Sequence, residues 1–267
     1  MLGLVLVLLV PCGVSAALPG TVAILVLKEK GVGTTAQAQP HVDRLMGVIG
    51  GLANWEVEGR YLRSRSRAVQ YIKEQQPQFA LLSLSAFLAM RVEYGLEVLG
   101  KVEAFAAGGR RYFFVSRDHD DVGGCRGATV ASDHLDDPRF VERVVMRGAF
   151  RLAEFEWVRT RRPVQTLKKV MRGEATCALI DDAQYASLAT IDGADQLKAV
   201  WRSKPLPPMA VVAFRNTTAT SRRVMKRYLA AICQGDGAAI CEQAGLRSLV
   251  AADRSVFAGA VLAYGPS

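Results

Sequence analysis

Polar side chains that could hold a small solute follow two predicted strands in similar stretches of the chain. Ser83 and Ser85 end the apolar run that begins at Phe79, and Asp181 ends the run that begins at Cys177. A helical pattern precedes each run, so residues 67–85 and 166–185 both predict a helix, a turn, a buried strand and a polar end. Hydroxyl and carboxylate groups at the carboxyl ends of parallel strands are typical of ligand sites. The chemistry they favour is reversible binding in a cleft shared by two α/β lobes.

The sequence lacks the common motifs of covalent and metal-dependent catalysis. It contains no Gly-x-Ser-x-Gly, His-Glu-x-x-His or Cys-x-x-Cys, and His41, His119 and His134 are scattered. Ser132, Asp133 and His134 are adjacent, but neighbours on one loop rarely aim at one reacting atom. We therefore expect no enzyme, no metal site and no cofactor.

Alternating strands and helices must position these residues. The continuous apolar run 21–27 predicts a strand that is covered on both faces. Further strands are predicted at 57–62, 79–83, 112–116, 127–131, 154–158, 177–180, 198–201 and 209–214. Helices are predicted at 63–75, 86–94, 138–152, 163–172, 183–190, 221–233 and 238–244. The last fifteen residues are expected to pack on the surface.

This order predicts an α/β protein with one lobe inserted in the other. After a leader at 1–16, residues 17–107 and 206–267 are expected to form lobe one, and residues 108–205 lobe two. A polar, turn-rich stretch near Asp118 precedes the second α/β pattern, and the strand at 209–214 returns the chain to the first lobe. The two connections between the lobes would act as a hinge, with the ligand cleft between them.

The first sixteen residues predict a secretory signal peptide. They form an uncharged run rich in Leu and Val that ends in Val14-Ser15-Ala16, with small residues at the positions that cleavage requires. The run is too short to span a bilayer comfortably. A membrane anchor and, through Cys12, a lipoprotein are the alternatives. We expect export to the periplasm, with cleavage near Ala16.

Four cysteines remain once that leader is removed, and an even number in an exported protein permits two disulfides. Cys233 and Cys241 flank a turn-rich segment that could fold one back on the other. Cys125 and Cys177 each stand at the start of a predicted strand in the same half of the chain. The alternative is four buried free thiols.

The formal charge is +9, and arginines cluster near residues 60–67, 159–162 and 222–227. Nucleic acid is a possible partner of such a chain, but the clusters lack the interleaved aromatic side chains that stack on bases. We expect a solvated basic surface and no nucleic-acid partner.

Several blocks of the sequence resemble one known family. They are Phe79-Ala-Leu-Leu-Ser-Leu-Ser85, Arg126-Gly-Ala-Thr-Val-Ala131, Arg172-Gly-Glu-Ala-Thr-Cys-Ala-Leu-Ile-Asp-Asp182 and Trp201-Arg-Ser-Lys-Pro-Leu-Pro-Pro208. Their order resembles that of phosphate/phosphonate substrate-binding proteins, the periplasmic components of ABC importers. The resemblance covers residues 21 to about 244. It implies a type II periplasmic-binding-protein fold and capture of a small molecule without chemistry.

The resemblance also implies positions for the ligand-binding residues. Ser83 and Ser85 would face the ligand from lobe one, and Tyr112 would line the cleft near the crossing. Lobe two would contribute Ser132, Asp133, His134, Arg161, Arg162 and Asp181. A permease is the implied partner, the membrane is reached only through it, and the binding protein itself is expected to be a monomer.

The loop 132–137 departs from the family pattern. Phosphonate binders typically present a Ser/Thr-rich helix N-terminus there, whereas this chain has Ser132-Asp-His-Leu-Asp-Asp137. Carboxylates in that loop would repel a phosphonate if they were desolvated and unpaired.

Each candidate also has a structural alternative. Asp133, Asp137 and Asp181 could cap helices, Ser83 and Ser85 could satisfy backbone groups at a turn, and Arg161 and Arg162 could be solvated. An alternative function is a noncatalytic periplasmic sensor or adaptor, or a carrier of an apolar ligand, with the same fold.

Overall fold

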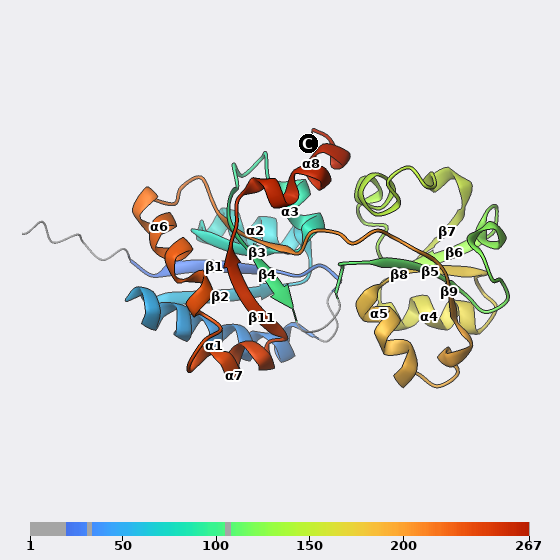
Figure 1. Ribbon diagram of the computed structural model, residues 1–267, viewed down its shortest axis with the longest axis horizontal. Helices are drawn as coiled ribbons and strands as arrows, with labels where there is room; N and C mark the ends of the chain where they lie inside the picture. The colour runs from blue at the N-terminus through green and yellow to red at the C-terminus, as the bar shows by residue number, and fades with distance from the viewer. Residues whose placement is uncertain (1–19, 31–33, 105–107, 267) are drawn as a thin grey trace, which may run out of the picture.

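The computed structural model describes residues 20–30, 34–104 and 108–266. It folds into two α/β lobes, each built on its own sheet and joined by two connections (Figure 1). The first sheet has the strand order β11-β4-β10-β3-β1-β2 and the second the order β7-β6-β8-β5-β9. We call the parts built on these sheets lobe one and lobe two. The chain leaves lobe one after β4 and returns with β10, so lobe two is inserted in lobe one, as predicted.

The elements of lobe one surround its sheet on both faces. The strands are β1 (Val22–Leu27), β2 (Val57–Leu62), β3 (Phe79–Leu82), β4 (Glu97–Ala104), β10 (Met209–Ala213) and β11 (Leu246–Ala251). The helices are α1 (Thr35–Ala53), α2 (Arg65–Gln75), α3 (Leu84–Met90), α6 (Ala219–Tyr228), α7 (Gly237–Gln243) and α8 (Ala258–Tyr264). Strands β1, β2 and β3 are parallel, so their carboxyl ends meet at one edge. That edge faces lobe two.

The elements of lobe two are shorter. Its strands are β5 (Tyr112–Ser116), β6 (Thr129–Ser132), β7 (Glu156–Arg159), β8 (Cys177–Asp181) and β9 (Lys198–Arg202). Its helices include η2 (Phe140–Met146), α4 (Pro163–Met171) and α5 (Asp182–Ser187). A helix was predicted over 138–152, but only η2 forms, and it has π geometry. It ends early because Arg147 and Gly148 both adopt positive φ, at 48° and 81°.

Local sequence signals explain where the helices near the cleft begin. Thr34 and Gln37 form a reciprocal capping box at the start of α1. Asp181 and Gln184 do the same for α5, so the predicted capping role of Asp181 is confirmed. Proline at position 163 starts α4, where its missing N–H has no cost.

The two connections between the lobes are hydrogen-bonded to each other. The backbone N–H of Leu206 donates to the carbonyl of Arg110 at 2.8 Å, and that of Ser203 donates to the carbonyl of Tyr112, also at 2.8 Å. These bonds hold the outgoing and returning segments side by side, as expected of a hinge.

The C-terminal segment corrects one prediction. It was expected to pack on the surface, yet Phe257 is fully buried and Tyr264 is 5% exposed. Helix α8 lies over the junction of the lobes (Figure 1), and one hydrophobic cluster joins Phe257 and Tyr264 to Phe140 of lobe two. Strand β11, which precedes this helix, was not predicted either. The C-terminal segment thus contributes to contact between the lobes.

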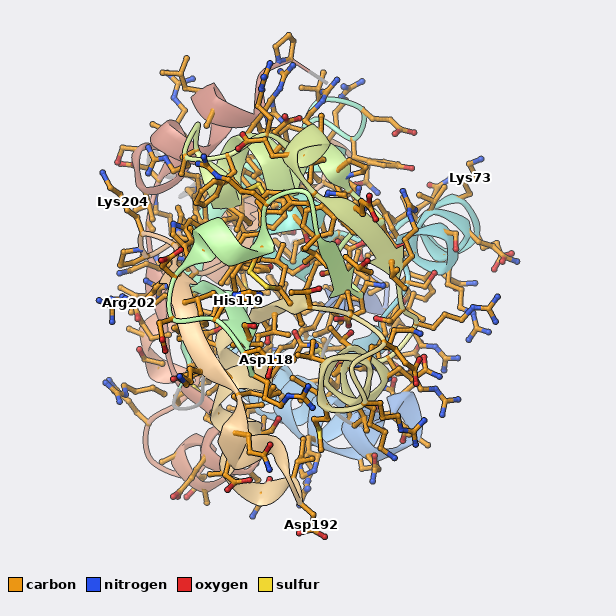
Figure 2. The ribbon with its side chains drawn as sticks, turned by 90° about the vertical axis from the view of Figure 1, so that its right-hand side faces the viewer. Lys73, Asp118, His119, Asp192, Arg202 and Lys204 are labelled. Carbon is orange, nitrogen blue, oxygen red and sulfur yellow. A yellow bond between two sulfur atoms is a disulfide. The ribbon has the colours of Figure 1, made fainter. Side chains whose placement is uncertain are left out.

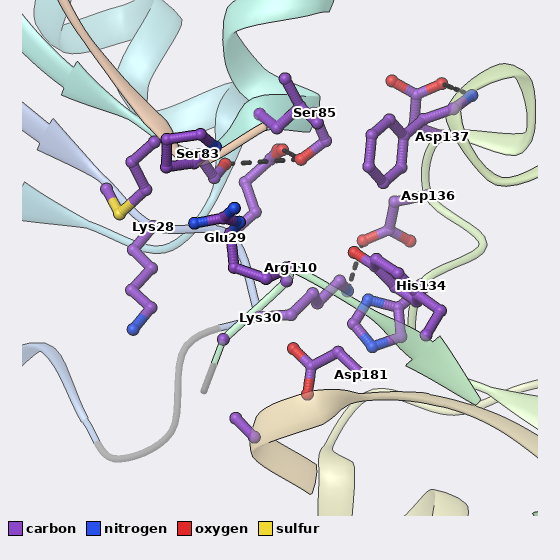
Figure 3. Close-up of a pocket in the computed structure, with 18 of the residues that line it drawn as sticks. Lys28, Glu29, Lys30, Ser83, Ser85, Arg110, His134, Asp136, Asp137 and Asp181 are labelled. Atoms are coloured by element: carbon purple, nitrogen blue, oxygen red, sulfur yellow. Dashed lines mark hydrogen bonds and ion pairs between the residues drawn. The ribbon is translucent and has the colours of Figure 1, made fainter. Parts of the chain in front are cut away.

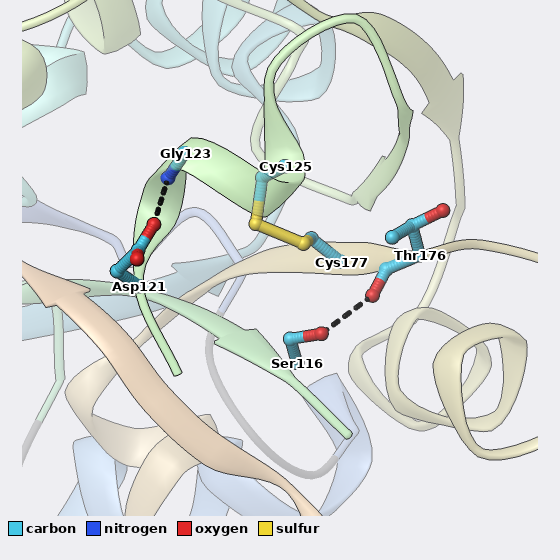
Figure 4. Close-up of a disulfide and its surroundings, with 6 residues drawn as sticks. All are labelled: Ser116, Asp121, Gly123, Cys125, Thr176 and Cys177. Carbon is cyan, nitrogen blue, oxygen red and sulfur yellow. Dashed lines mark hydrogen bonds between the residues drawn. A yellow bond between two sulfur atoms is a disulfide. The ribbon is translucent and has the colours of Figure 1, made fainter. Parts of the chain in front are cut away.

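Both predicted cysteine pairs are present as disulfides. Cys125 and Cys177 are bonded with a Cα–Cα distance of 5.8 Å, and Cys233 and Cys241 with one of 5.5 Å. The first bond ties a 3-10 turn to the start of β8 (Figure 4), so Cys125 stands before β6 rather than in a strand. The alternative of four free thiols is wrong.

Charged side chains cover the outer surface. Seen from the lobe-two end, Lys73, Asp192, Arg202 and Lys204 point outward (Figure 2), and all four are exposed. In the described part of the chain, no helix combines the length and the apolar character needed to cross a membrane. The predicted signal peptide lies outside the described residues.

Candidate functional site

A cavity of about 360 Å³ lies between the lobes. Lobe one lines it with residues 28–30 after β1 and 83–85 after β3, and the hinge adds residues 108–110 and 207–209. Lobe two lines it with Tyr112, His134, residues 136–137, Phe140 and the start of α5. Figure 3 shows labelled side chains from both lobes around this space. The cavity therefore lies where the carboxyl ends of the strands meet the hinge.

Five of the predicted site residues line this cavity: Ser83, Ser85, Tyr112, His134 and Asp181. Ser83 and Ser85 stand at the start of α3, with their hydroxyl oxygens 3.4 Å apart. The Ser85 hydroxyl also donates to Glu29 Oε2 at 2.7 Å (Figure 3). Both hydroxyls thus bond to side chains, and Ser83 makes no capping hydrogen bond to the backbone of α3.

The other four predicted residues lie elsewhere. The Ser132 hydroxyl donates to the carbonyl of Leu179, and Asp133 is buried behind the cavity wall. Arg161 is exposed and lines a separate basic groove with Arg159 and Lys168. Arg162 is exposed at the N-cap of α4. We leave these four out of the ligand-binding set proposed below.

Gln184 connects the buried polar groups of lobe two. Its Nε2 donates to Asp133 Oδ1 at 2.9 Å, and its Oε1 accepts from the backbone N–H of Asp181 at 2.9 Å. The same Oε1 lies 2.8 Å from His134 Nε2, which must be the donor because the amide oxygen can only accept. Gln184 therefore fixes the orientation of the His134 ring in the cavity wall. Nothing in the local sequence indicated this role, because Gln184 has the pattern of an ordinary helix residue.

Charged residues that the sequence analysis did not select also line the cavity. They are Lys28, Glu29, Lys30, Arg65, Arg110, Asp136 and Asp137. Residues 28–30 directly follow β1, so the rule that selected Ser83 and Asp181 would have selected them as well. Arg65 stands three residues after the end of β2, as Ser85 does after β3, so the same rule applied to β2 would have selected it too.

Arg65 joins the two lobes. It makes two hydrogen bonds to the Glu29 carboxylate, at 3.0 and 2.9 Å, and one to Asp137 Oδ2 of lobe two at 3.1 Å. Burial alone would lower the pKa of Arg65, but the hydrogen bonds and charges of Glu29 and Asp137 outweigh it and raise that pKa. The guanidinium is thus held fully charged between two carboxylates.

Two of the three carboxylates of the loop 132–137, Asp136 and Asp137, are paired. Asp137 accepts from Arg65 and from the Tyr264 hydroxyl at 3.0 Å, and it caps η2 by accepting from the Phe140 N–H at 3.0 Å. Asp136 forms an ion pair with Lys30 at 2.5 Å. The condition for repulsion, an unpaired and desolvated carboxylate, is therefore not met by Asp136 or Asp137. Asp133 accepts from Gln184 and Thr166 through Oδ1, but its buried Oδ2 has no hydrogen-bond partner among the described residues.

Lys28, by contrast, has no carboxylate partner among the described residues. Within the described ranges, its ammonium group makes no ion pair or hydrogen bond, and it lies close to Gly108 in the hinge. Nearby, Arg110 Nε donates to the carbonyl of Leu206 at 2.7 Å, which holds its guanidinium at the hinge. Among the described residues, no group of His, Cys, Asp or Glu side chains is arranged to hold a metal ion.

Comparison with known proteins agrees with this geometry. The profile of one family, described as "ABC transporter, phosphonate, periplasmic substrate-binding protein", matches residues 26–257. The chain belongs to this family. It is therefore a periplasmic substrate-binding component of an ABC transporter, from a family that binds solutes and does not catalyse reactions. A search of curated proteins found no matching sequence.

Solved structures of several proteins share the two-lobed fold. A Xanthomonas citri protein bound to ATP has a TM-score of 0.70 at 10% identity, covering 92% of this chain and 98% of its own. The protein PhnD1 from Prochlorococcus marinus, in complex with methylphosphonate, has a TM-score of 0.67 at 9% identity, covering 89% and 94%. The binding component of a Pseudomonas aeruginosa phosphonate transporter has a TM-score of 0.65 at 10% identity, covering 89% and 83%. At these identities the likeness concerns the fold alone.

We expect the contact between Arg65 and Asp137 to set how far the lobes open. Asp137→Asn keeps an oxygen to cap η2 but removes the charge that Arg65 binds, so it should lower the free energy of unfolding by about 1–3 kcal/mol. It should also raise the radius of gyration of the unliganded protein, measured by small-angle X-ray scattering. Asp136→Asn is the matched control, because Asp136 is 72% exposed and such pairs contribute about 0–1 kcal/mol. Equal effects of the two substitutions would contradict this role.

A pH dependence is expected from Asp181. Burial raises the pKa of Asp181 and the charge of His134 lowers it, with a net increase. The folded protein therefore holds a proton on Asp181 at pH values where the unfolded chain has lost it, so this group's contribution to stability falls as pH rises above about 4. Asp181→Asn can still cap α5 but has no proton to lose. Between pH 4 and 7, the thermal midpoint of the wild type should fall relative to that of the variant. If the two midpoints change with pH in parallel, Asp181 is not the source of the pH dependence.

Proposed function

We propose that this protein captures a small organic anion of the phosphonate type in the interlobe cavity and delivers it to the permease of an ABC importer. The observation that carries the proposal is Lys28, a cavity-lining cation that has no carboxylate partner within the described part of the chain. The family of the chain supports the proposal, and two of its structural relatives hold ATP and methylphosphonate, which both carry phosphorus oxyanions.

The charge balance of the cavity favours an anion over a cation. Four cations and four carboxylates line it, but Glu29, Asp136 and Asp137 are already bound by Lys30 and Arg65. Asp181 is the remaining carboxylate, and its raised pKa makes it a poorer partner for a cation. An incoming anion would meet Lys28 and Arg110, with the hydroxyls of α3 nearby.

The proposal includes the organisation of the mature protein. The signal peptide would be removed near Ala16, residues 17–107 and 206–267 would form lobe one, and residues 108–205 lobe two. The protein would act as a monomer. Its ligand-binding residues would be Lys28, Arg110, Ser83, Ser85, Tyr112, His134 and Asp181.

Titration calorimetry of the mature protein tests the proposal. Methylphosphonate should bind with one-to-one stoichiometry, whereas ethylamine, a cation of similar size, should give no heat of binding. Binding of the amine without binding of the phosphonate would contradict the proposed charge of the ligand.

A further inference from the structure

A second cavity, of about 260 Å³, lies inside lobe one beside the interlobe cavity. We call it the side chamber. Apolar side chains from the strands and from α1 form its wall: Val26, Val42, Leu45, Tyr61, Leu81 and Val102. All six belong to the hydrophobic core between the sheet and α1. The chamber is thus a gap at the carboxyl end of that core.

Small residues explain why the core does not fill this space. Ala38 in the first turns of α1 lines one side, and Ala244 and Gly245 after α7 line another. Gly245 has a φ of 72°, a conformation that disfavours any larger residue at the turn into β11. No long side chain is therefore available from these positions to fill the gap.

The side chamber adjoins the proposed ligand site. Five residues line both cavities: Lys28, Gly108, Arg110, Pro208 and Met209. Two of them are the cations assigned above to the anionic group of the ligand. An anion placed between Lys28 and Arg110 would stand where the polar cavity and the apolar chamber adjoin.

We infer that the ligand is an organic anion with an unbranched alkyl chain, and that the side chamber binds this chain while Lys28 and Arg110 bind the anionic group. The inference rests on the proposed function and narrows its ligand class. Burial of each methylene group in the chamber removes apolar surface from water, so affinity should rise with chain length. The polar cavity alone would give no such rise.

A series of alkylphosphonates tests the inference. Titration calorimetry with methyl-, ethyl-, butyl- and hexylphosphonate should show affinity rising about fourfold per methylene, which corresponds to about 0.8 kcal/mol for each. An affinity that stays constant or falls along the series, with methylphosphonate still bound, would overturn the inference and leave the proposed function standing. If none of the four binds, the proposed function itself fails.

A variant that fills the chamber provides a second test. Ala38→Phe places a ring in the chamber. Hexylphosphonate should then bind this variant no more tightly than methylphosphonate does, while the affinity for methylphosphonate stays at the wild-type value. Ala36→Phe is the matched control, because Ala36 is exposed on the same helix, and it should keep the full gain. Retained methylphosphonate binding shows that the variant is folded. An unchanged hexylphosphonate affinity in Ala38→Phe would overturn the placement of the alkyl chain in the side chamber.

Discussion

Lys28→Glu is expected to weaken the binding of methylphosphonate by roughly 100-fold or more. A hydrogen bond to a charged group contributes about 1.5–3 kcal/mol, and the new carboxylate adds repulsion to the loss of that contact. Stability should change little, because Lys28 makes no ion pair within the described part of the chain. Titration calorimetry measures the affinity, and the thermal midpoint reports the fold.

Lys73→Glu is the matched control for that experiment. It makes the same change of charge on the exposed surface of α2, away from the cavity (Figure 2). Its affinity for methylphosphonate should stay within about twofold of the wild type, because exposed charges at long range are screened. Equal losses in the two variants would show that net charge, and not a contact at Lys28, governs binding.

Loss of the Cys125–Cys177 disulfide is expected to have the largest effect on stability. The bond closes a loop of 52 residues, for which the loss of chain entropy in the unfolded state predicts about 4 kcal/mol. Both cysteines are fully buried, and the bond anchors β8, whose last residue is Asp181. The double variant Cys125→Ala/Cys177→Ala should therefore unfold at a clearly lower denaturant concentration than the wild type.

The second disulfide provides the comparison. Cys233 and Cys241 are separated by 8 residues, so the same relation predicts about 2.5 kcal/mol. Cys233→Ala/Cys241→Ala should thus be the milder of the two double variants when their free energies of unfolding are measured in guanidinium chloride. The reverse order would show that loop length does not determine the contribution of these bonds.

Local patterns were enough to predict most of the fold. The continuous apolar run at 21–27 and the run beginning at Phe79 became β1 and β3, because strands buried on both faces need no alternation. Polar residues at their ends then identified the edge of the sheet where the cavity lies. Ser83, Ser85 and Asp181 were found in this way, and the same rule applied to β1 would have added Lys28.

Contacts between distant segments could not be predicted in the same way. Arg65 and Tyr264 both bind Asp137, although Tyr264 is 127 residues away along the chain. Nothing in the short segment around Tyr264 indicates a partner in lobe two. Its burial depends on where α8 lies against η2, which only the assembled lobes determine.

Arg161 and Arg162 were predicted from local sequence to bind the ligand, but they lie outside the cavity. Arg161 and Arg162 follow β7, as the rule for ligand sites requires, but β7 is the edge strand of its sheet. Their side chains are exposed there and do not reach the cavity. β2 is also an edge strand, yet Arg65 after it lines the cavity, so a place at the carboxyl end of a strand does not by itself decide whether a residue faces the cleft.

The crystal structure of the mature protein with methylphosphonate would test the central claim most directly. We predict that the phosphonate lies between the lobes, with an oxygen within about 3 Å of Lys28 Nζ, the usual range for a charge-assisted hydrogen bond. Its methyl group should point toward the side chamber. A phosphonate bound outside the interlobe cavity, or one inside it that does not contact Lys28, would contradict the proposed site.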